Sequence, residues 1–419
     1  MKKEVEQVKE LKKYTRRGIG LLAALALACA GGMATGAHGV AVAESAVFET
    51  AGAEAASSGT GSVATVEERG LDLGDSSVRY PVVTGIGDEA LEKKINDQIL
   101  QDCKILDYLA RMSMLISGGS IHVEWEGGVL GDLFTCVVSA SGQVESSRKT
   151  HVWTASNIDL RTGEPIGWDQ LFTDGARAGE IAERYLAGRV APEMSAHLLN
   201  SELTPIPEIF RVEKAGLTLL YPVDQLSTLS GRAGAVRIGW HELRDVLNLE
   251  ADSVPDRAGV AGMIHLTEES AKSLRRMAAE GCVEGIPARI GDSLRFWTDR
   301  AHLLIDPDIF RDGRLFSLEG ASFRDVFLIT DALGEDWEDS VVEGIRVDQG
   351  CVYGLCPGET ARDAWRAVLG DPDYAVEIDP DTAEAYRIIP GTCDYYACGD
   401  HQLQLYADEN GILSSLILK

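Results

Sequence analysis

Two pairs of cysteines in the last quarter of the chain have the residue type and the spacing for metal binding or for disulfide formation. Cys351 and Cys356 enclose four residues, and Cys393 and Cys398 repeat this spacing further along the chain. Four thiolates could hold a zinc ion tetrahedrally, whereas an oxidising compartment favours disulfides. Because the N-terminus has the layout of an export signal, described below, we expect disulfides among these four residues.

A third pair of cysteines is more widely spaced. Cys103 and Cys136 could form a further disulfide, which leaves Cys282 without a predicted partner. For the four C-terminal cysteines, crossed pairs would close a long loop and stabilise the fold by about 4 kcal/mol through loop entropy, whereas two local rings would give less. The sequence leaves both pairing patterns open.

The remaining reactive residue types do not form a familiar catalytic motif. The chain has no Gly-x-Ser-x-Gly elbow, no His-Glu-x-x-His, no Gly-Lys-Ser/Thr phosphate loop and no Gly-x-Gly-x-x-Gly. Its eight histidines are scattered singly. We therefore expect no catalytic residues, no cofactor and no metal centre.

Paired carboxylates are another candidate for chemistry. They occur in Asp-Pro turns, as Asp306/Asp308, Asp371/Asp373 and Asp379/Asp381. Asp-Pro-Asp can donate oxygens to calcium, but none of the three begins a twelve-residue loop with a terminal Glu, so turn formation is the preferred interpretation. A glycosidase-type pair of acids is set by folding rather than by local spacing. The sequence therefore does not identify one among its 66 acids.

The net charge of the chain limits the classes of partner that it can bind. A net charge of -27 over 419 residues repels nucleic acid and anionic lipid and attracts cationic proteins or metal ions. Hydrophobic residues at 45% and charged residues at 25% are ordinary for a globular protein. Solubility alone is the other explanation of the acidic balance.

Residues 1–43 resemble an export signal, with a basic segment that ends at Arg17, an apolar core and a small-x-small site before Glu44. Both the general secretory and the twin-arginine routes fit. We expect a mature protein that begins at Glu44; a lipid anchor at Cys29 is the alternative, and the apolar core is short for a membrane-spanning helix. Residues 44–62 are rich in Ala, Gly and Ser and are typical of a flexible tether.

Residues 63–250 alternate between strand and helix patterns. Apolar residues recur every three or four positions between Asp88 and Ser113, which predicts one helix capped by Asp88. His151–Thr173 predicts a strand, a glycine turn, an extended segment and a short helix. Phe210–Val212 and Leu217–Tyr221 predict a hairpin.

Three segments of this region resemble the extracellular domain shared by RsiV-type anti-sigma factors and the non-catalytic part of PdaC-like peptidoglycan deacetylases. They are Tyr80-Pro81 before a helix, the Asp159-Leu160-x-Thr162-Gly163 turn with Trp168–Phe172, and a closing Pro-aromatic step with a glycine. The resemblance implies an α+β domain over residues 63–250, with a long helix packed on antiparallel strands.

The resemblance also implies a recognition loop. Its residues here are Tyr221, Pro222, Val223, Asp224 and Gly231. Val223 stands where the family has Tyr, so lysozyme binding does not carry over directly. We expect the loop to contact a basic envelope protein, a lysozyme-like protein or a cell-wall fragment.

The rest of the chain predicts smaller α+β units. Asn248–Gly262 is typical of a linker, and residues 262–339 predict a helix after Thr267 with strands near Leu294–Trp297 and Phe323–Thr330. Residues 341–419 predict a helix near Trp365, strands at Tyr386–Ile389, Gln402–Tyr406 and Ile412–Leu418, and resemble the OmlA and β-lactamase-inhibitor type of module, which binds proteins.

The functional expectation is an exported protein of the bacterial envelope that binds or senses a cationic protein or a wall-derived ligand without catalysis. An envelope hydrolase, or an accessory part of a peptidoglycan-modifying enzyme, is the alternative, although the chain has no His-x-x-x-His for deacetylase metal binding. A true anti-sigma factor needs a cytoplasmic domain, whereas only residues 1–17 precede the apolar core.

Overall fold

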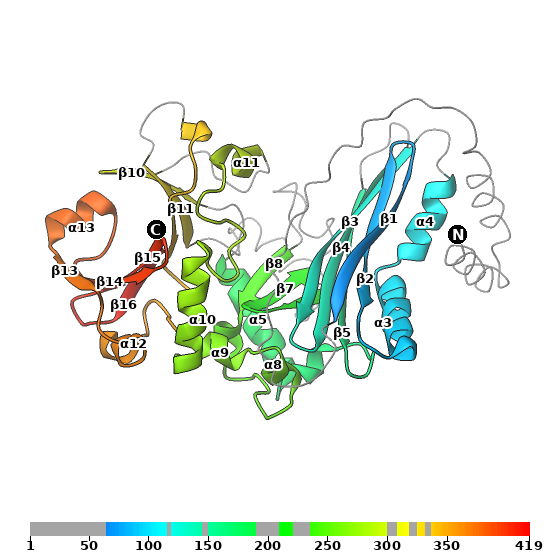
Figure 1. Ribbon diagram of the computed structural model, residues 1–419, viewed down its shortest axis with the longest axis horizontal. Coiled ribbons are helices and arrows are strands. Elements are labelled where there is room, and N and C mark those ends of the chain that lie inside the picture. The colour runs from blue at the N-terminus through cyan, green and yellow to red at the C-terminus, as the bar shows by residue number, and fades with distance from the viewer. Residues whose placement is uncertain are drawn as a thin grey trace.

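The expected α+β class is confirmed: the fold combines helices with three sheets over the described residues (Figure 1). The computed structural model describes residues 64–114, 119–144, 150–189, 209–220, 235–299, 308–317, 325–331 and 337–419. The expected export signal, the tether and Cys29 lie outside these ranges. Among the described helices, none combines the length and apolarity that crossing a membrane requires.

The first sheet has the strand order β1-β2-β3-β4-β5. Its strands are Thr65–Leu73, Ser76–Thr84, Gly119–Leu130, Leu133–Val144 and Thr150–Asp159. All neighbours are antiparallel except β2 and β3, which are parallel. Parallel neighbours need a crossover connection, and helices α3 (Glu89–Asp102) and α4 (Ile105–Met114) provide it.

These two helices replace the single helix expected between Asp88 and Ser113. Asp88 caps α3 as expected, since its side chain accepts hydrogen bonds from the amides of Ala90 (2.9 Å) and Leu91 (3.1 Å). The helix then breaks at Lys104, whose φ of 54° is left-handed. The break lets Ile99 and Ile105 both face the sheet, where they are fully buried. The expectation of one continuous helix was therefore wrong.

The middle of the chain forms a second sheet, β6-β7-β8. Its strands are Ile209–Glu213, Gly216–Leu220 and Ala235–Gly239, and α5 (Gly175–Arg189) precedes them. The expected hairpin is β6–β7. The two sheets are joined by Asn157, which donates to the carbonyl of Phe210 and accepts from the amide of Val212, both at 2.8 Å. Short helices η1 (Trp168–Gln170) and η2 (Trp240–Leu243) follow the first and second sheets.

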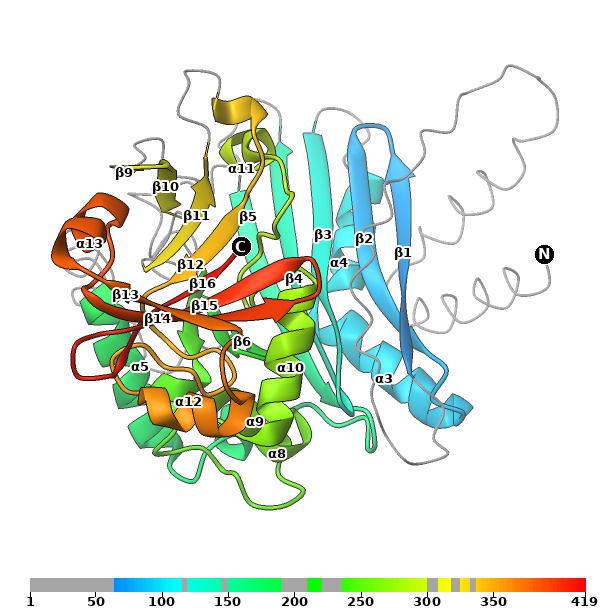
Figure 2. The same ribbon diagram turned by 60° about the vertical axis from the view of Figure 1, so that its left-hand side comes forward.

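The C-terminal half contains a sheet of eight described strands in the order β13-β14-β15-β16-β12-β11-β10-β9 (Figure 2). In chain order they are Asp308–Phe310, Gly313–Ser317, Val326–Thr330, Gly344–Val347, Tyr374–Ile378, Gly391–Cys398, His401–Ala407 and Leu413–Leu418. Strand β11 pairs with β12, and β12 with β16. The expected boundary near residue 340 thus lies inside one sheet.

Four of the described helices accompany this sheet. They are α10 (Glu268–Ala279), α11 (Leu294–Asp299), α12 (Arg362–Leu369) and α13 (Pro380–Tyr386). The strand expected near Leu294 is helix α11, which buries Leu294 and Trp297 three residues apart on one face. The strand expected at Tyr386–Ile389 is also wrong, because Asp379 caps a helix that runs to Tyr386.

The segment expected to be a linker is packed. Helix α8 (Val254–Arg257) buries Val254, and Ala258 beyond it is 4% exposed. Arg257 donates hydrogen bonds to Asp132 (3.0 Å) and Asp159 (2.9 Å) of the first sheet. The largest buried core includes residues on both sides of this segment, such as Trp240 and Leu274. Residues 248–262 therefore tie the two halves together instead of separating them.

Candidate functional site

The expected recognition loop cannot be placed. Tyr221, Pro222, Val223, Asp224 and Gly231 all lie outside the described residues. The strand that leads toward them, β7, ends at Leu220, which is 2% exposed. The described residues offer other candidate sites at the cysteines, at the junction between the halves and on the charged surfaces.

Cys351 and Cys356 form a disulfide with Cα atoms 4.2 Å apart. The six-residue loop that begins and ends with these cysteines is closed a second time by Val352 and Leu355, whose amides and carbonyls exchange hydrogen bonds of 3.0 Å. Gly354 has a φ of 79°, and a Cβ atom at this position would lie 2.2 Å from the amide nitrogen of Leu266. The loop is thus both locally fixed and pressed against the chain after α9 (Ala261–Ile264).

The other two C-terminal cysteines do not complete this arrangement. Cys393 and Cys398 are free and buried on β14, and each belongs to a different buried core. Residues five apart on a strand point to opposite faces. The crossed disulfide pattern, the second local ring between Cys393 and Cys398, and a zinc site of all four thiolates are therefore wrong.

Cys103 and Cys136 are brought together as the sequence predicts. Their sulfur atoms lie 3.8 Å apart, both fully buried between α3 and β4, and they are not bonded in this structure. The contact with Cys136 and the burial of the site raise the pKa of the Cys103 thiol above its ordinary value. Cys282 is half-buried, and burial raises the pKa of its thiol as well.

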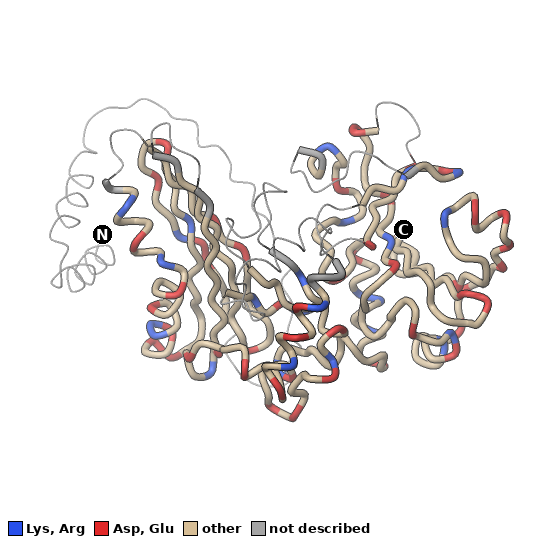
Figure 3. Tube along the Cα trace, turned by 180° about the vertical axis from the view of Figure 1, so that it is seen from behind, with Lys and Arg blue, Asp and Glu red and all other residues tan. Residues whose placement is uncertain are grey.

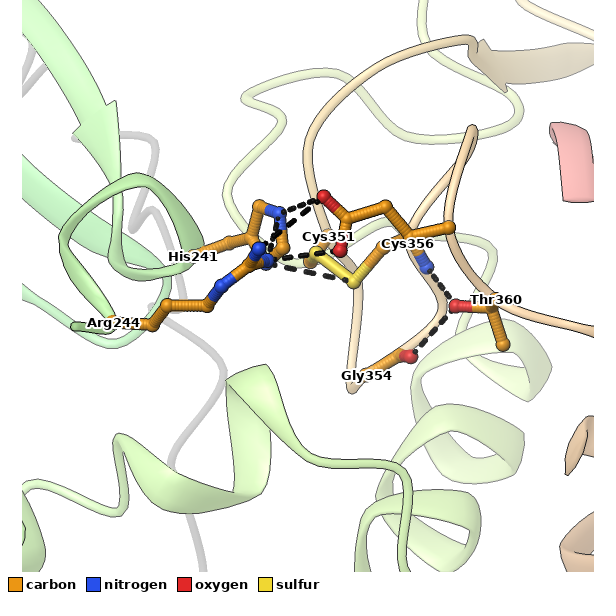
Figure 4. Close-up of a disulfide and its surroundings, with 7 residues drawn as sticks. His241, Arg244, Cys351, Gly354, Cys356 and Thr360 are labelled. Carbon is orange, nitrogen blue, oxygen red and sulfur yellow. Dashed lines mark hydrogen bonds and ion pairs between the residues drawn. A yellow bond between two sulfur atoms is a disulfide. The ribbon is translucent and has the colours of Figure 1, made fainter.

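Polar side chains surround the disulfide on the side of η2 (Figure 4). The Nδ1 atom of His241 lies 3.8 Å from the sulfur of Cys356, and the Nε2 atom lies 3.1 Å from the carboxylate of Glu359. Arg244 lies against the His241 ring and donates to Glu359 at 2.9 Å. Burial alone would raise the pKa of Glu359, but the bonds from Arg244 and His241 hold it below its ordinary value.

The disulfide loop also carries a second junction contact. Lys214 of the β6–β7 turn donates to the Tyr353 hydroxyl (2.6 Å) and to Glu284 (2.8 Å). Burial and the charge of Glu284 raise the pKa of Tyr353 well above its ordinary value. The disulfide loop therefore contacts the middle of the chain at two residues: Tyr353 contacts Lys214, and Cys356 contacts His241.

A cavity of about 90 Å³ lies at this junction. Its lining includes Arg237, His241, Glu242, Glu284 and Cys351. Pockets for drug-sized ligands usually measure about 300–1,000 Å³. The cavity has room for a small polar group and not for a large substrate.

A second candidate surface lies at one end of the large sheet. Strand β13 is its terminal strand, and Tyr374 and Val376 on it are 48% and 41% exposed. Six acids and no Lys or Arg occur between residues 371 and 384, and red predominates at this end of the molecule (right in Figure 3). The acids are Asp371, Asp373, Glu377, Asp379, Asp381 and Glu384. We call strand β13 and helix α13 with these residues the acidic edge.

Neighbouring residues hold side chains of the acidic edge in place. Tyr374 stacks on Tyr395 of β14 with ring centroids 4.4 Å apart, and its hydroxyl accepts a hydrogen bond from Gln402 at 2.8 Å. Asp379 accepts from the amide of Thr382 at 2.9 Å, which confirms that its Asp-Pro step begins a turn into a helix. The exposed side chains are therefore held in place by their neighbours.

Beneath the edge, Asp394 of β14 is fully buried and binds two arginines. Arg362 donates to it at 2.6 and 3.1 Å, Arg366 twice at 2.7 Å, and the Trp365 indole at 3.1 Å. Burial alone would raise the pKa of Asp394, but these bonds hold it well below its usual range. Both arginines of α12 are thus paired with a single buried carboxylate, which offsets one of their two positive charges.

Several of these residues were not candidates from the sequence. Local sequence patterns single out none of His241, Lys214, Tyr353 and Glu359. His241 and Glu359 are 118 positions apart. The acids from Asp371 onward are part of the Asp-Pro turns noted in the sequence. The absence of basic residues between them is the signal that could have identified the acidic edge.

No protein-family model matches the chain, and no curated protein matches it. Among solved structures, a DUF3298 family member from Bacteroides fragilis covers 48% of this chain and 98% of its own, at 12% identity and a TM-score of 0.38. A DUF3298 family protein from Pseudomonas aeruginosa covers 44% and 94%, at 12% identity and a TM-score of 0.34. A DUF4309 family protein from Bacillus subtilis covers 36% and 97%, at 13% and 0.20. Similarities this low carry no argument about function.

Proposed function

We propose that this protein is a non-catalytic binding protein of the extracytoplasmic space, and that a cationic polypeptide binds along its acidic edge. The observation that carries the proposal is the combination of a terminal sheet strand with a one-sided run of acids. Export is supported by the signal-like N-terminus and by the disulfide of Cys351 and Cys356, which suits an oxidising compartment.

The strand supplies the mode of binding. A terminal strand leaves main-chain donors and acceptors on one side, and an extended peptide can add to it as a further strand. The outward exposure of Tyr374 and Val376 gives such a peptide apolar contacts beside the main-chain bonds. Because Tyr374 is already stacked on Tyr395, little side-chain entropy is lost on binding.

The charges of the acidic edge indicate which kind of partner binds it. Residues 341–419 contain 14 Asp and Glu against five Lys and Arg. Three of these five, Arg346, Arg362 and Arg366, form ion pairs with Asp348 and the buried Asp394. The acids of the edge therefore face solvent with few compensating cations of their own module, which favours a basic partner.

The test is calorimetric titration of the purified chain with lysozyme as a basic protein, with a lysine-rich peptide and with a cell-wall glycan fragment. Salt is set at about 0.15 M and about 1 M, where charges are screened over about 8 and 3 Å. The edge variant Asp371→Asn/Glu377→Gln/Glu384→Gln removes three exposed charges. The control Glu67→Gln/Glu124→Gln/Glu180→Gln removes three exposed charges from the N-terminal half.

We expect the edge variant to weaken binding of the basic probes by roughly tenfold, about 1.4 kcal/mol, and the control variant to weaken it much less. Equal weakening by both variants would mean that net charge alone attracts the probes, and the proposal would be lost. Binding of the glycan fragment alone would assign the protein to wall recognition instead. Turnover of that fragment would support an envelope hydrolase.

A further inference from the structure

The two cysteines of the disulfide differ in their access to solvent. Cys351 is half-buried and borders the junction cavity, whereas Cys356 is 6% exposed. In thiol–disulfide exchange a thiolate attacks one sulfur and displaces the other, so access decides which sulfur is attacked. A small thiol that enters the cavity meets Cys351.

The environment of Cys356 suits a sulfur that leaves as a thiolate. His241 Nδ1 lies 3.8 Å from its sulfur, and Arg244 lies against the same imidazole (Figure 4). Positive charge near a sulfur stabilises its thiolate, and the Arg244 guanidinium, held against the His241 ring by its 2.7 Å contact with Nδ1, supplies that charge. A more stable thiolate leaves faster. Glu359 is the opposing charge, and it is held by hydrogen bonds to both His241 and Arg244.

We infer that the Cys351–Cys356 disulfide is an exchange-active site for thiols, in which Cys351 is the attacked sulfur, Cys356 the leaving sulfur, and His241 the positioning residue for the thiolate. The substrate class is a low-molecular-weight thiol, whose sulfur can reach Cys351 through the junction cavity. This inference does not depend on the acidic edge.

The reaction balances in two exchanges. A thiolate RS⁻ forms a bond to the Cys351 sulfur as the S–S bond breaks, and the bonding pair leaves on Cys356. A second RS⁻ attacks the R sulfur of the mixed disulfide, releases RSSR and leaves Cys351 as a thiolate. The protons of the two thiols pass to the two cysteines, so two RSH are oxidised while the protein disulfide is reduced.

The loop is built to return to its starting state. The paired hydrogen bonds between Val352 and Leu355 and the bond from the Gly354 amide to the Met263 carbonyl (2.9 Å) do not depend on the disulfide. These bonds keep the two reduced cysteines adjacent. The hydrogen bond from the Cys356 amide to the Thr360 hydroxyl (2.8 Å) holds Cys356 in the same way. Adjacent thiols reclose quickly when a disulfide partner arrives.

The experiment exposes the purified, oxidised chain to reduced glutathione under native conditions. Samples are quenched by alkylation, and mass spectrometry locates glutathione and free thiols on each cysteine. The variants are His241→Ala, His241→Lys, which returns a cation beside Cys356, and the exposed His122→Ala as the matched control. Urea unfolding of each variant checks that the comparison is made on folded protein.

We expect glutathione on Cys351 before any appears on Cys356. We expect exchange about tenfold slower in His241→Ala, because the leaving thiol becomes less acidic. The rate should be near that of the unaltered chain in His241→Lys and in His122→Ala. Reduction only at urea concentrations that unfold the chain, glutathione first on Cys356, or equal rates in the three histidine variants would each overturn the inference.

Discussion

The hydroxyl group of Tyr353 donates a hydrogen bond of 2.9 Å to the carboxylate of Glu284. The same hydroxyl accepts from Lys214, so three residues from three separate parts of the chain close one triangle. Tyr353 itself is 3% exposed and stands at the tip of the disulfide loop. This triangle is one of the links between the C-terminal half and the β6–β7 turn.

Tyr353→Phe should lower the free energy of unfolding by about 1–2 kcal/mol, since it removes a hydroxyl that bonds to two charged groups while it leaves the ring in place. Urea denaturation measures the change. Tyr386→Phe is the control, because the Tyr386 hydroxyl bonds to Asp312 at an exposed position and should contribute at most about 0.5 kcal/mol. An equal loss in both variants would contradict the role assigned to the triangle.

Asp394→Asn should destabilise the C-terminal half by about 3 kcal/mol, because it leaves Arg362 and Arg366 side by side without the buried carboxylate that both of them contact. The exposed Asp400→Asn on the adjacent turn is the control and should stay within about 0.5 kcal/mol. Thermal or urea unfolding followed by tryptophan fluorescence measures the change. A change below 1 kcal/mol in Asp394→Asn would show that the arginines find other partners.

The same carboxylate predicts how stability changes with pH. The pKa of Asp394 is lower in the folded protein than in the unfolded chain, so its contribution is present in full above about pH 4, the range of an unfolded Asp. It is lost as the pH falls below that value toward the folded pKa. The difference in unfolding free energy between the unaltered protein and Asp394→Asn should therefore shrink between about pH 4 and pH 2. A difference that stays constant across this window would rule out the charged form as its source.

Cys103 and Cys136 should form a second disulfide in protein isolated from an oxidising compartment. Their sulfurs are 3.8 Å apart, and a small rotation of the side chains would bring them to bonding distance. The bond would close a loop over a sequence separation of 33 residues and raise the free energy of unfolding by roughly 4 kcal/mol through loop entropy. Peptide mapping without prior reduction should find the linked peptides, and Cys103→Ser should lower stability far more than Cys282→Ser does. Free thiols at both positions in such material would refute the pairing.

Local signals carried much of the prediction of this fold. The sequence predicted three local features: the Asp88 cap of α3, the Thr267 cap of α10 and the β6–β7 hairpin. Helix caps, hydrophobic periodicity and turns depend on residues that are close together in the sequence. The break at Lys104 was not, since a left-handed lysine has no sequence pattern. Strand β14 was also missed, because it carries the buried Asp394 where a strand pattern would place an apolar residue.

The candidate sites depended on long-range contacts and were less predictable. The Cys351–Cys356 bond was within reach of sequence reasoning because the two residues are close along the chain. The position of His241 beside Cys356, 115 residues away, follows only from the way η2 packs against the disulfide loop. The observed separation of Cys393 from the other thiols could not be read from spacing either, since it depends on which face of β14 each residue takes.

Strand β16 lies between β15 and β12, although it is the last of the eight described strands to be synthesised. The hairpin β14–β15 and the earlier strands β9–β12 are therefore joined side by side only when Leu413–Leu418 arrives. Until then the folding chain has two strand edges, at β12 and β15, that β16 later covers, and each is able to pair with a second copy. The interval before β16 closes the sheet is therefore when aggregation competes most strongly with folding.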